Sequence, residues 1–440
     1  MPDSSAPMIE LDPASLHPAL TDPALTAMNF LNEVASCYPD AVSFAPGRPF
    51  EEFWDVAQIP RYLERFCEHL RKDRGMDEAA VVRTLHQYGR TKGVIADIVA
   101  RHLGADEGIT AAPDAVVVTV GCQEAMVLVL RALRATDRDV VLAVDPTYVG
   151  LTGAARLVDM PVLPVASGAE GVDREDLARC VAEARAAGLR PRALYVMPDF
   201  ANPTGLSMPE EGRRALLETA EREDILLLED NPYGLFCGAA ERPPTLKALD
   251  TTGRVVYLGS FAKTVLPGAR VGYVVADQRV RGSAGIFADE LAKIKSMITV
   301  NTSPISQAIV AGRLLENDGS LDLANTAERH QYQRNLSQLI DGLGRRLGSV
   351  PGVSWNQPRG GFFVVVTVPV AVGDAELEYS GRAHGVLWTP MRHFYGGAGG
   401  EHQLRLSCSS LDGDRIEQGL DRLAAFLIEA ITSAGGICER

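Results

Sequence analysis

The sequence predicts an α/β fold followed by a smaller α+β domain, and two patterns carry that prediction. From about residue 77 onward, short runs of β-branched residues alternate with helical segments rich in Ala, Leu and Arg. Such alternation is typical of a mostly parallel sheet that helices cover on both faces. Beyond residue 350 the pattern changes to strands and one closing helix, which indicates a second domain of α+β type.

The predicted elements follow one another in that order along the chain. Residues 1–26 are rich in proline and lack periodicity, so we expect an irregular arm. We expect strands at 115–120, 140–144, 193–197, 225–229, 255–259 and 271–276, and helices at 123–135, 174–187 and 209–223. A long helix at 327–347 then leads to strands at 362–368 and 403–407 and a helix at 414–433. We therefore divide the chain into 1–58 (arm and part of the small domain), 59–330 (large domain) and 331–440 (small C-terminal domain).

The composition excludes several classes of protein. Hydrophobic residues make up 46% of the 440 residues and charged residues 23%, which is typical of a folded soluble chain. The net charge of -14 disfavours nucleic acid and anionic membranes as partners. The 7 cysteines form no CxxC pair, and the acidic N-terminus does not resemble a signal peptide. We expect a cytoplasmic protein with reduced thiols, no membrane span and no metal site.

A possible phosphate site follows the first predicted strand. Ligands of open parallel sheets bind beyond the carboxyl ends of the strands. Gly121, Cys122 and Gln123 follow such an end and open a helix. Backbone N–H groups at a helix start, together with the positive end of the helix dipole, favour a phosphate. A plain strand–turn–helix connection has the same pattern, so this segment alone does not decide between the two.

Two later strand ends carry polar residues suited to an aromatic ligand. Asn202 precedes a Pro and a Gly, so a fixed turn presents its amide, although an Asn-Pro turn without chemistry is an equal alternative. Asp230 ends a fully apolar strand, where a carboxylate needs a cationic or hydrogen-bonding partner. A pyridinium N–H is such a partner. Tyr233, three residues later, would present a phenol to the same ligand.

The segment from Ser260 to Arg270 holds the candidate nucleophile. Lys263 stands four residues beyond a predicted strand end and seven before Arg270. An ammonium group close to other cations loses its proton more easily, which favours Schiff-base formation by Lys263. Ser260 and Arg270 are suited to a phosphate. A surface lysine and a strand-end ion pair would explain each residue singly, but not the whole set with Asn202 and Asp230.

Three motifs together resemble the fold-type I pyridoxal-phosphate enzymes, in particular the class I/II aminotransferases, over roughly residues 40–430. They are Asn202-Pro-Thr-Gly205, Asp230-x-x-Tyr233 and Ser260-Phe-Ala-Lys263-x-x-x-Pro-Gly-x-Arg270. The resemblance implies a mostly parallel seven-stranded sheet in the large domain, with pyridoxal 5′-phosphate bound there. It implies that Lys263 holds the cofactor as a Schiff base, Asp230 pairs with the ring nitrogen, and Asn202 and Tyr233 bind the ring hydroxyl. Gly121, Cys122, Gln123, Ser260 and Arg270 would surround the phosphate.

The same resemblance implies further roles. Tyr148 matches the aromatic residue that stacks on the cofactor ring, so Lys263, Asp230 and Tyr148 are the expected catalytic residues. Tyr88 matches a tyrosine that reaches the phosphate of the partner subunit, which implies a homodimer with shared active sites. Arg405 matches the arginine that binds the substrate α-carboxylate, with Asn202 beside it.

The chain also departs from the family pattern. Ala201 stands where Gln is frequent, and Cys122 where Ser or Ala is commoner. Gly47 and Arg48 lie in the segment that resembles the family's N-terminal substrate segment, but Arg48 replaces the usual Leu or Ile. Arg48 would contact an acidic or phenolic substrate; a solvated arm residue is the alternative.

These features predict an aminotransferase that moves an amino group between an L-amino acid and a 2-oxo acid. The composition and the segment around Gly47 are similar to enzymes of actinobacterial secondary metabolism that make aryl-glycines for antibiotics, such as hydroxyphenylglycine and dihydroxyphenylglycine. Aromatic or aryl-glycine substrates are therefore favoured. A lyase, decarboxylase or cyclising enzyme on the same scaffold is the alternative. A ligand-sensing domain without catalysis fits less well, because the short acidic arm has no room for a DNA-binding domain.

Overall fold

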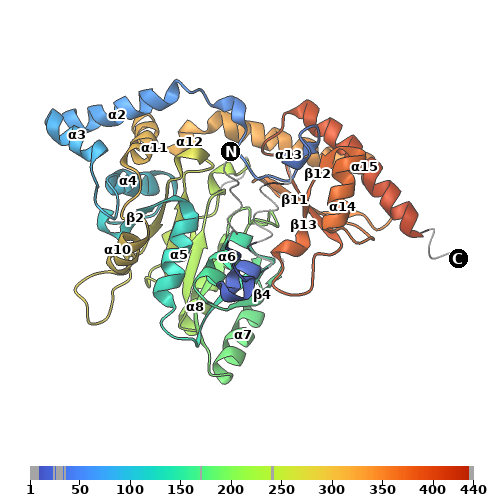
Figure 1. The fold of residues 1–440 in the computed structure, drawn as a ribbon, viewed down its shortest axis with the longest axis horizontal. Helices are drawn as coiled ribbons and strands as arrows, with labels where there is room; N and C mark the ends of the chain where they lie inside the picture. The colour runs from blue at the N-terminus through green and yellow to red at the C-terminus, as the bar shows by residue number, and fades with distance from the viewer. Residues whose placement is uncertain are drawn as a thin grey trace, which may run out of the picture.

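A computed structural model describes residues 9–22, 25, 33, 36–168, 171–238 and 242–435 of the chain. Its centre is an eight-stranded sheet, and a second layer of short strands and long helices stands beside it (Figure 1). The central sheet runs in the order β2 (Val116–Thr119), β9 (Gly272–Val275), β8 (Val255–Ser260), β7 (Leu226–Asp230), β6 (Arg190–Val196), β3 (Asp139–Asp145), β4 (Val162–Gly168) and β5 (Gly171–Val172).

Parallel pairs form the middle of this sheet. β8, β7, β6, β3 and β4 are parallel neighbours, whereas β9 is antiparallel to β8 and β2, and β5 is antiparallel to β4. The parallel strands end at one edge, so the residues that follow β6, β7 and β8 come together there.

Helices cover both faces of the sheet, as the buried runs of the strands require. The helices of this part are α2 (Gln58–Lys72), α3 (Glu78–His86), α4 (Ala96–Asp106), α5 (Gly121–Leu133), α6 (Val149–Leu157), α7 (Arg174–Ala186), α8 (Glu210–Arg222), α9 (Leu246–Leu249), α10 (Phe287–Ile298), α11 (Pro304–Glu316) and α12 (Leu321–Ala324). α5, α6 and α10 pack on one face, while α2, α4 and α11 cover the β2 side of the other face and α7 and α8 its β4 side. Alternate residues of each strand enter the two cores.

The second layer follows the long helix α13 (Thr326–Leu347). It contains β10 (Ser354–Trp355), β11 (Phe363–Thr367), α14 (Asp374–Tyr379), β12 (Val386–Leu387), β13 (Thr389–Pro390), β14 (Gln403–Ser407) and α15 (Gly413–Gly435). Four strands form an antiparallel sheet in the order β10, β11, β14, β13. The N-terminal strand β1 (Val42–Ser43) pairs in parallel with β12, so this part of the N-terminal segment belongs to the second layer. The division into three parts with boundaries at 58 and 330 stays a prediction.

The expected α/β fold is confirmed, with corrections. The six strands predicted in the large domain and the long helix are all present near their expected positions. The expected count of seven strands was wrong, because the two-residue β5 adds an edge strand. The strand at 271–276 is antiparallel, since the short segment after β8 cannot hold the crossover that a parallel pair needs. β4 escaped prediction because its residues are largely half-buried or exposed and include Pro164.

The N-terminal part differs from a purely irregular arm. Residues 9–22 contain two short 3-10 turns, Pro13–Ser15 and Pro18–Thr21, and lie against α6 through an ion pair of Asp22 with Arg156. Residues 1–8, 23, 24 and 26, which the prediction also covered, lie outside the described residues. Among the helices that the structure describes, none combines the length and apolar character needed to cross a membrane.

Candidate active site

A cleft of about 260 Å³ lies at the carboxyl ends of β6, β7 and β8, where the second layer faces the sheet. Residues from both layers and from the segment after β1 line it. They are Ala45, Pro46, Gly47, Arg48, Cys122, Gln123, Met126, Tyr148, Val149, Met197, Asn202, Asp230, Pro232, Tyr233, Ser260, Ala262, Lys263, Arg270, Phe394 and Arg405. The structure thus brings together every predicted site residue except Gly121, which adjoins the cleft through Arg270, and Tyr88.

Lys263 enters the cleft from the turn that follows β8. Its Nζ donates a hydrogen bond of 2.6 Å to the carbonyl oxygen of Gly47. Burial, and then the charges of Arg270 and Arg405, lower the pKa of Lys263 to about 8. Arg48 acts in the same direction to a smaller extent. An amine with this pKa has a substantial neutral fraction near neutral pH, as a nucleophile or general base requires.

Asp230 ends β7 at the floor of the cleft and is 3% exposed. The hydroxyl of Tyr195 donates to its Oδ2 at 2.6 Å, and the thiol of Cys122 to its Oδ1 at 3.4 Å. Burial raises the pKa of Asp230 to about 6, although both hydrogen bonds lower it. In the described part of the chain, no lysine or arginine pairs with this carboxylate. A buried carboxylate with only neutral donors is suited to a cationic N–H group of a ligand.

The start of α5 and Arg270 form a cationic corner of the cleft. Gly121 opens the helix with a φ of +70°, and a Cβ there would lie 2.5 Å from Nη2 of Arg270. Arg270 itself has a left-handed backbone with a φ of +52°, which is strained for an arginine. Its guanidinium has no acidic partner among the described residues. Together with the free N–H groups of the helix start, it provides the charge that a phosphate needs.

Gly272 of β9 allows this corner to form. A Cβ at Gly272 would lie 2.7 Å from the backbone nitrogen of Cys122 and from the carbonyl carbon of Gly121. Only glycine leaves room for the helix start to approach the strand this closely.

Arg405 comes from β14 in the second layer and is 5% exposed. Its guanidinium lies between the rings of Phe363 and Phe394, at 4.4 and 4.9 Å from their centroids. It donates to Oδ1 of Asn202 and to the carbonyl oxygen of Ala45, and its buried Nε has no partner. Burial lowers the pKa of Arg405 to about 10. The described residues offer it no carboxylate, so it is suited to bind one from a ligand.

The remaining predicted side chains surround these charges. Tyr233 and Asn202 both line the cleft, and burial raises the pKa of Tyr233 well above its ordinary value. Burial also raises the pKa of Tyr148 to about 12, so both phenols stay protonated as donors. Gln123 turns away to the carbonyl oxygen of Gly150, at 2.8 Å, so only its backbone is suited to a phosphate.

Two predicted residues stand apart from this set. The Tyr88 side chain is 85% exposed and does not line the cleft of its own chain. Arg48 lines the cleft but is exposed at its mouth, while its carbonyl oxygen accepts a hydrogen bond from Ser409 at 2.6 Å. Arg48 is therefore placed to meet a ligand and is not merely a residue of a solvated arm.

Three contributors were not predicted. Tyr195 supports Asp230, and Phe363 and Phe394 sandwich Arg405. Tyr195 is the one aromatic residue in a strand of otherwise aliphatic and basic residues, a signal that could have been used. The two phenylalanines give no such signal, because they come from different segments of the second layer and meet only in the folded chain.

The site fits pyridoxal 5′-phosphate on the chemistry of its donors. Lys263 supplies an amine for an aldehyde, Asp230 a carboxylate for the ring nitrogen, and Arg270 with the start of α5 a phosphate site. The unpartnered Nε of Arg405 leaves binding capacity for a substrate carboxylate.

The comparisons with known proteins agree with this geometry. The model of the aminotransferase class I and II family matches residues 61–423. The chain is 59% identical, over 425 residues, to (S)-3,5-dihydroxyphenylglycine transaminase from Amycolatopsis orientalis, with 97% of this chain and 96% of that protein covered. It is 28% identical over 392 residues to aromatic-amino-acid aminotransferase 1 from Thermococcus litoralis, with 89% and 88% covered.

Solved structures give the same answer. The crystal structure of kynurenine aminotransferase from Pyrococcus horikoshii in complex with PMP superposes with a TM-score of 0.79 at 28% identity, covering 91% of this chain and 94% of that one. These matches favour amino-group transfer over the lyase, decarboxylase, cyclising and ligand-sensing alternatives. The chain belongs to the class I and II aminotransferases and is a fold-type I transaminase that depends on pyridoxal 5′-phosphate.

Proposed function

We propose that this enzyme transfers the amino group between an aryl-glycine and a 2-oxo acid, with 3,5-dihydroxyphenylglycine as the favoured aryl-glycine. The observation that carries the proposal is the 59% identity, over 97% of the chain, to a (S)-3,5-dihydroxyphenylglycine transaminase. The cleft supports it, since Arg405 is suited to the α-carboxylate and Arg48 stands at the mouth with donors for phenolic oxygens. A role in making antibiotic precursors follows from such a substrate.

The residues of the cleft divide the work of transamination. When bound, pyridoxal 5′-phosphate supplies the electron sink for chemistry at the substrate α-carbon. Arg405 binds the α-carboxylate and so fixes the α-carbon in the cleft. The Nζ of Lys263 takes the α-proton as general base and returns a proton as general acid in the reverse direction. Its pKa of about 8 suits both tasks near neutral pH.

The floor and walls hold the cofactor in our proposal. Asp230 accepts the ring N–H and keeps that nitrogen protonated, while Tyr195 and Cys122 keep the carboxylate ionised. Tyr148 would stack on the ring, and Asn202 with Tyr233 would bind the ring hydroxyl. Ser260, Arg270 and the backbone of Gly121, Cys122 and Gln123 at the start of α5 would hold the phosphate.

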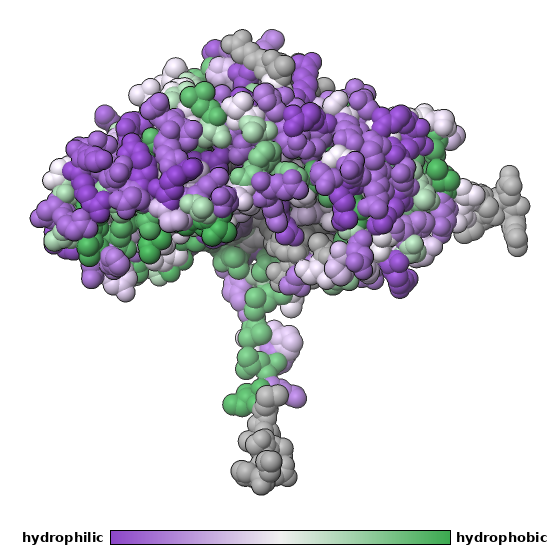
Figure 2. Space-filling model, turned by 90° about the horizontal axis from the view of Figure 1, so that it is seen from above, coloured by the Kyte–Doolittle hydropathy of each residue, from purple (hydrophilic) through white to green (hydrophobic). Residues whose placement is uncertain are grey.

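We also propose a homodimer in which Tyr88 completes the phosphate site of the partner subunit. The exposure of Tyr88 and its absence from its own cleft support this. Met297 and Ile298, 84% and 52% exposed, and the strained Val300 lie at the end of α10. Figure 2 shows apolar surface gathered along one edge of the half of the molecule that holds α2, α3 and α10.

The free thiols of the described cysteines fit the reducing cytoplasm, where we place the enzyme.

The first prediction tests the reaction and its substrate. The enzyme in its pyridoxamine form should convert 3,5-dihydroxyphenylglyoxylate with a kcat/KM at least about tenfold above that for phenylglyoxylate, which lacks the hydroxyl groups. Stopped-flow absorbance of the cofactor measures both rates. Lys263→Ala should lower both half-reactions by about 10⁴-fold, because the general acid and base is lost. Lys293→Ala, a surface variant, is the control. Equal turnover of all 2-oxo acids would remove the aryl-glycine assignment.

The second prediction concerns pH and Asp230. Below its pKa of about 6 the carboxyl group is protonated and cannot accept the ring N–H, so cofactor affinity of the apoenzyme should fall as the pH drops through this value. Tyr195→Phe removes a donor to the ionised form, so the pKa rises and the midpoint should move up by about one pH unit. Fluorescence titration with pyridoxal 5′-phosphate measures the midpoint. Tyr379→Phe is the surface control, and an unmoved midpoint in Tyr195→Phe contradicts the role of Tyr195.

The third prediction concerns Arg48. Arg48→Met keeps an unbranched apolar stem but removes the guanidinium donors, so the KM for 3,5-dihydroxyphenylglyoxylate should rise by about tenfold. The KM for phenylglyoxylate should change little. Arg61→Met, on the exposed face of α2, serves as control. A similar rise for both 2-oxo acids would show that Arg48 does not recognise the hydroxyl groups.

The fourth prediction tests the shared site. Tyr88→Phe should bind pyridoxal 5′-phosphate more weakly, and Lys263→Ala should be inactive. A mixed dimer of the two variants contains one site with an intact Lys263 and an intact Tyr88. Unfolding and refolding an equimolar mixture should therefore restore about a quarter of the wild-type activity at limiting cofactor. No gain over the separate variants would exclude the exchange of Tyr88 between subunits.

A further inference from the structure

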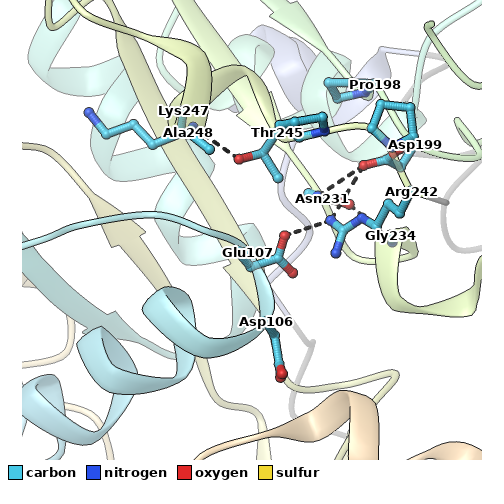
Figure 3. A network of polar contacts seen from close by, with 12 residues as sticks. Asp106, Glu107, Pro198, Asp199, Asn231, Gly234, Arg242, Thr245, Lys247 and Ala248 are labelled. Atoms are coloured by element: carbon cyan, nitrogen blue, oxygen red, sulfur yellow. Dashed lines mark hydrogen bonds and ion pairs between the residues drawn. The ribbon is translucent and has the colours of Figure 1, made fainter. Parts of the chain in front are cut away.

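A buried polar network adjoins the cleft residues Asn202 and Asp230 in the chain and includes none of the residues assigned above. Figure 3 shows Glu107, Arg242, Asp199 and Asn231 joined in this order, with Asp199 and Asn231 facing one another. Glu107 follows α4 and pairs with Arg242 at 2.6 Å. Arg242 also contacts Oδ2 of Asp199 at 3.4 Å, and the fully buried Arg213 of α8 pairs with the other side of the same carboxylate. Two acidic and two basic groups thus neutralise one another.

Arg213 anchors Asp199 to the surrounding backbone. Its Nε donates to the carbonyl oxygen of Met208 at 3.0 Å, and Nη1 donates to that of Pro244 at 3.0 Å. Nη2 donates both to Asp199 and to the carbonyl oxygen of Pro198, which precedes it. The carboxylate of Asp199 therefore has one fixed place relative to the segment that follows β6.

Asn231 links the segment that follows β6 to the segment that follows β7. Its Nδ2 donates to Oδ2 of Asp199 at 3.2 Å, while its Oδ1 accepts from the backbone N–H of Gly234 at 3.0 Å. The bond from Gly234 closes the turn that holds Tyr233. The backbone N–H of Asn231 donates to the carbonyl oxygen of Leu258 in β8. A single amide thus joins the Tyr233 turn to Asp199.

The position of this link in the chain gives it a function. Asp199 lies three residues before Asn202, and Asn231 directly follows Asp230. Asn202 and Tyr233 both line the cleft, so their separation depends on how the segments that follow β6 and β7 are placed relative to one another. A buried network in which each carboxylate is paired with an arginine favours one geometry more strictly than apolar packing of the same volume does.

We propose that Asp199 and Asn231 are positioning residues that hold Asn202 and Tyr233 at the spacing needed to bind the ring hydroxyl of the cofactor. Arg213 and Arg242 neutralise Asp199 so that it can remain buried as an acceptor. The inference rests on the proposed contact of Asn202 and Tyr233 with that hydroxyl group.

The test compares two cofactors in the apoenzyme. One is pyridoxal 5′-phosphate and the other is its analogue without the ring 3-hydroxyl group. The ratio is the dissociation constant of the analogue divided by that of pyridoxal 5′-phosphate, and it reports the hydroxyl contact. A general loss of stability does not change this ratio, provided that each variant is measured well below its Tm. Asn231→Ala and Asn231→Asp should each lower this ratio by about tenfold. Asn231→Asp keeps the acceptor for Gly234 but loses the donor to Asp199, so it isolates the link.

A double variant provides the rescue. Asp199→Asn combined with Asn231→Asp exchanges the amide and the carboxylate, so the link re-forms in the opposite direction with the same net charge, while Arg213 keeps a hydrogen bond to the amide oxygen at position 199 in place of its ion pair. Its ratio should return toward that of the wild type. Asn317→Ala, whose side chain bonds only to its own helix, is the matched control and should leave the ratio unchanged.

The reference variants separate this inference from the proposed function. Asn202→Ala and Tyr233→Phe should lower the ratio themselves. If they do and the Asn231 variants do not, the positioning role is overturned while the proposed hydroxyl contact stands. If none of the four variants changes the ratio, the hydroxyl contact itself is wrong and the positioning role falls with it.

Discussion

The constraint on which the site depends is a buried carboxylate, that of Asp230, which pairs with no cation among the described residues. Asp230 lies at the end of a central strand, and its donors in the described part of the chain are the hydroxyl of Tyr195 and the thiol of Cys122. Burial makes its charge costly, so the folded protein gains when a cationic N–H group enters the cleft. The same logic governs Arg405, whose guanidinium lies over the rings of Phe363 and Phe394 and pairs with no acidic side chain that the structure describes. The carboxylate of Asp230 and the guanidinium of Arg405 are therefore both suited to bind a group of opposite charge on a ligand.

The charges of the cleft are arranged so that one amine remains reactive. Arg270 and Arg405 lie near Lys263 and, together with burial, favour its neutral form. In a chain of net charge -14, the cleft holds Arg48, Arg270 and Arg405, none of which pairs with an acidic side chain that the structure describes, so the cleft reverses the overall charge locally. Anionic groups of the cofactor and substrate are attracted there, while the amine that must react with them is kept from holding its proton too tightly.

Two layers must meet for this arrangement to exist. The cofactor residues follow β6, β7 and β8 of the central sheet, whereas Arg405 lies on β14 of the second layer and Gly47 and Arg48 follow β1. The hydrogen bond from Arg405 to Asn202 crosses from one layer to the other. The hydrogen bond from Asn231 to Asp199 joins the segment that follows β7 to the segment that follows β6.

The sequence by itself determined the type of fold and the residues of the reactive centre. Lys263, Asp230 and Asn202 stand just after predicted strands, and the carboxyl ends of parallel strands share one edge, so local pattern was enough to group them. Arg270 was grouped with them by its spacing from Lys263. Local pattern could not predict what comes from pairing between distant segments. The antiparallel direction of β9, the aromatic sandwich of Arg405, the support of Asp230 by Tyr195 and the link from Asn231 to Asp199 were decided only by tertiary structure. Each depends on a hydrogen bond or packing contact between residues far apart in the chain, and neither periodicity nor spacing along the sequence records such contacts.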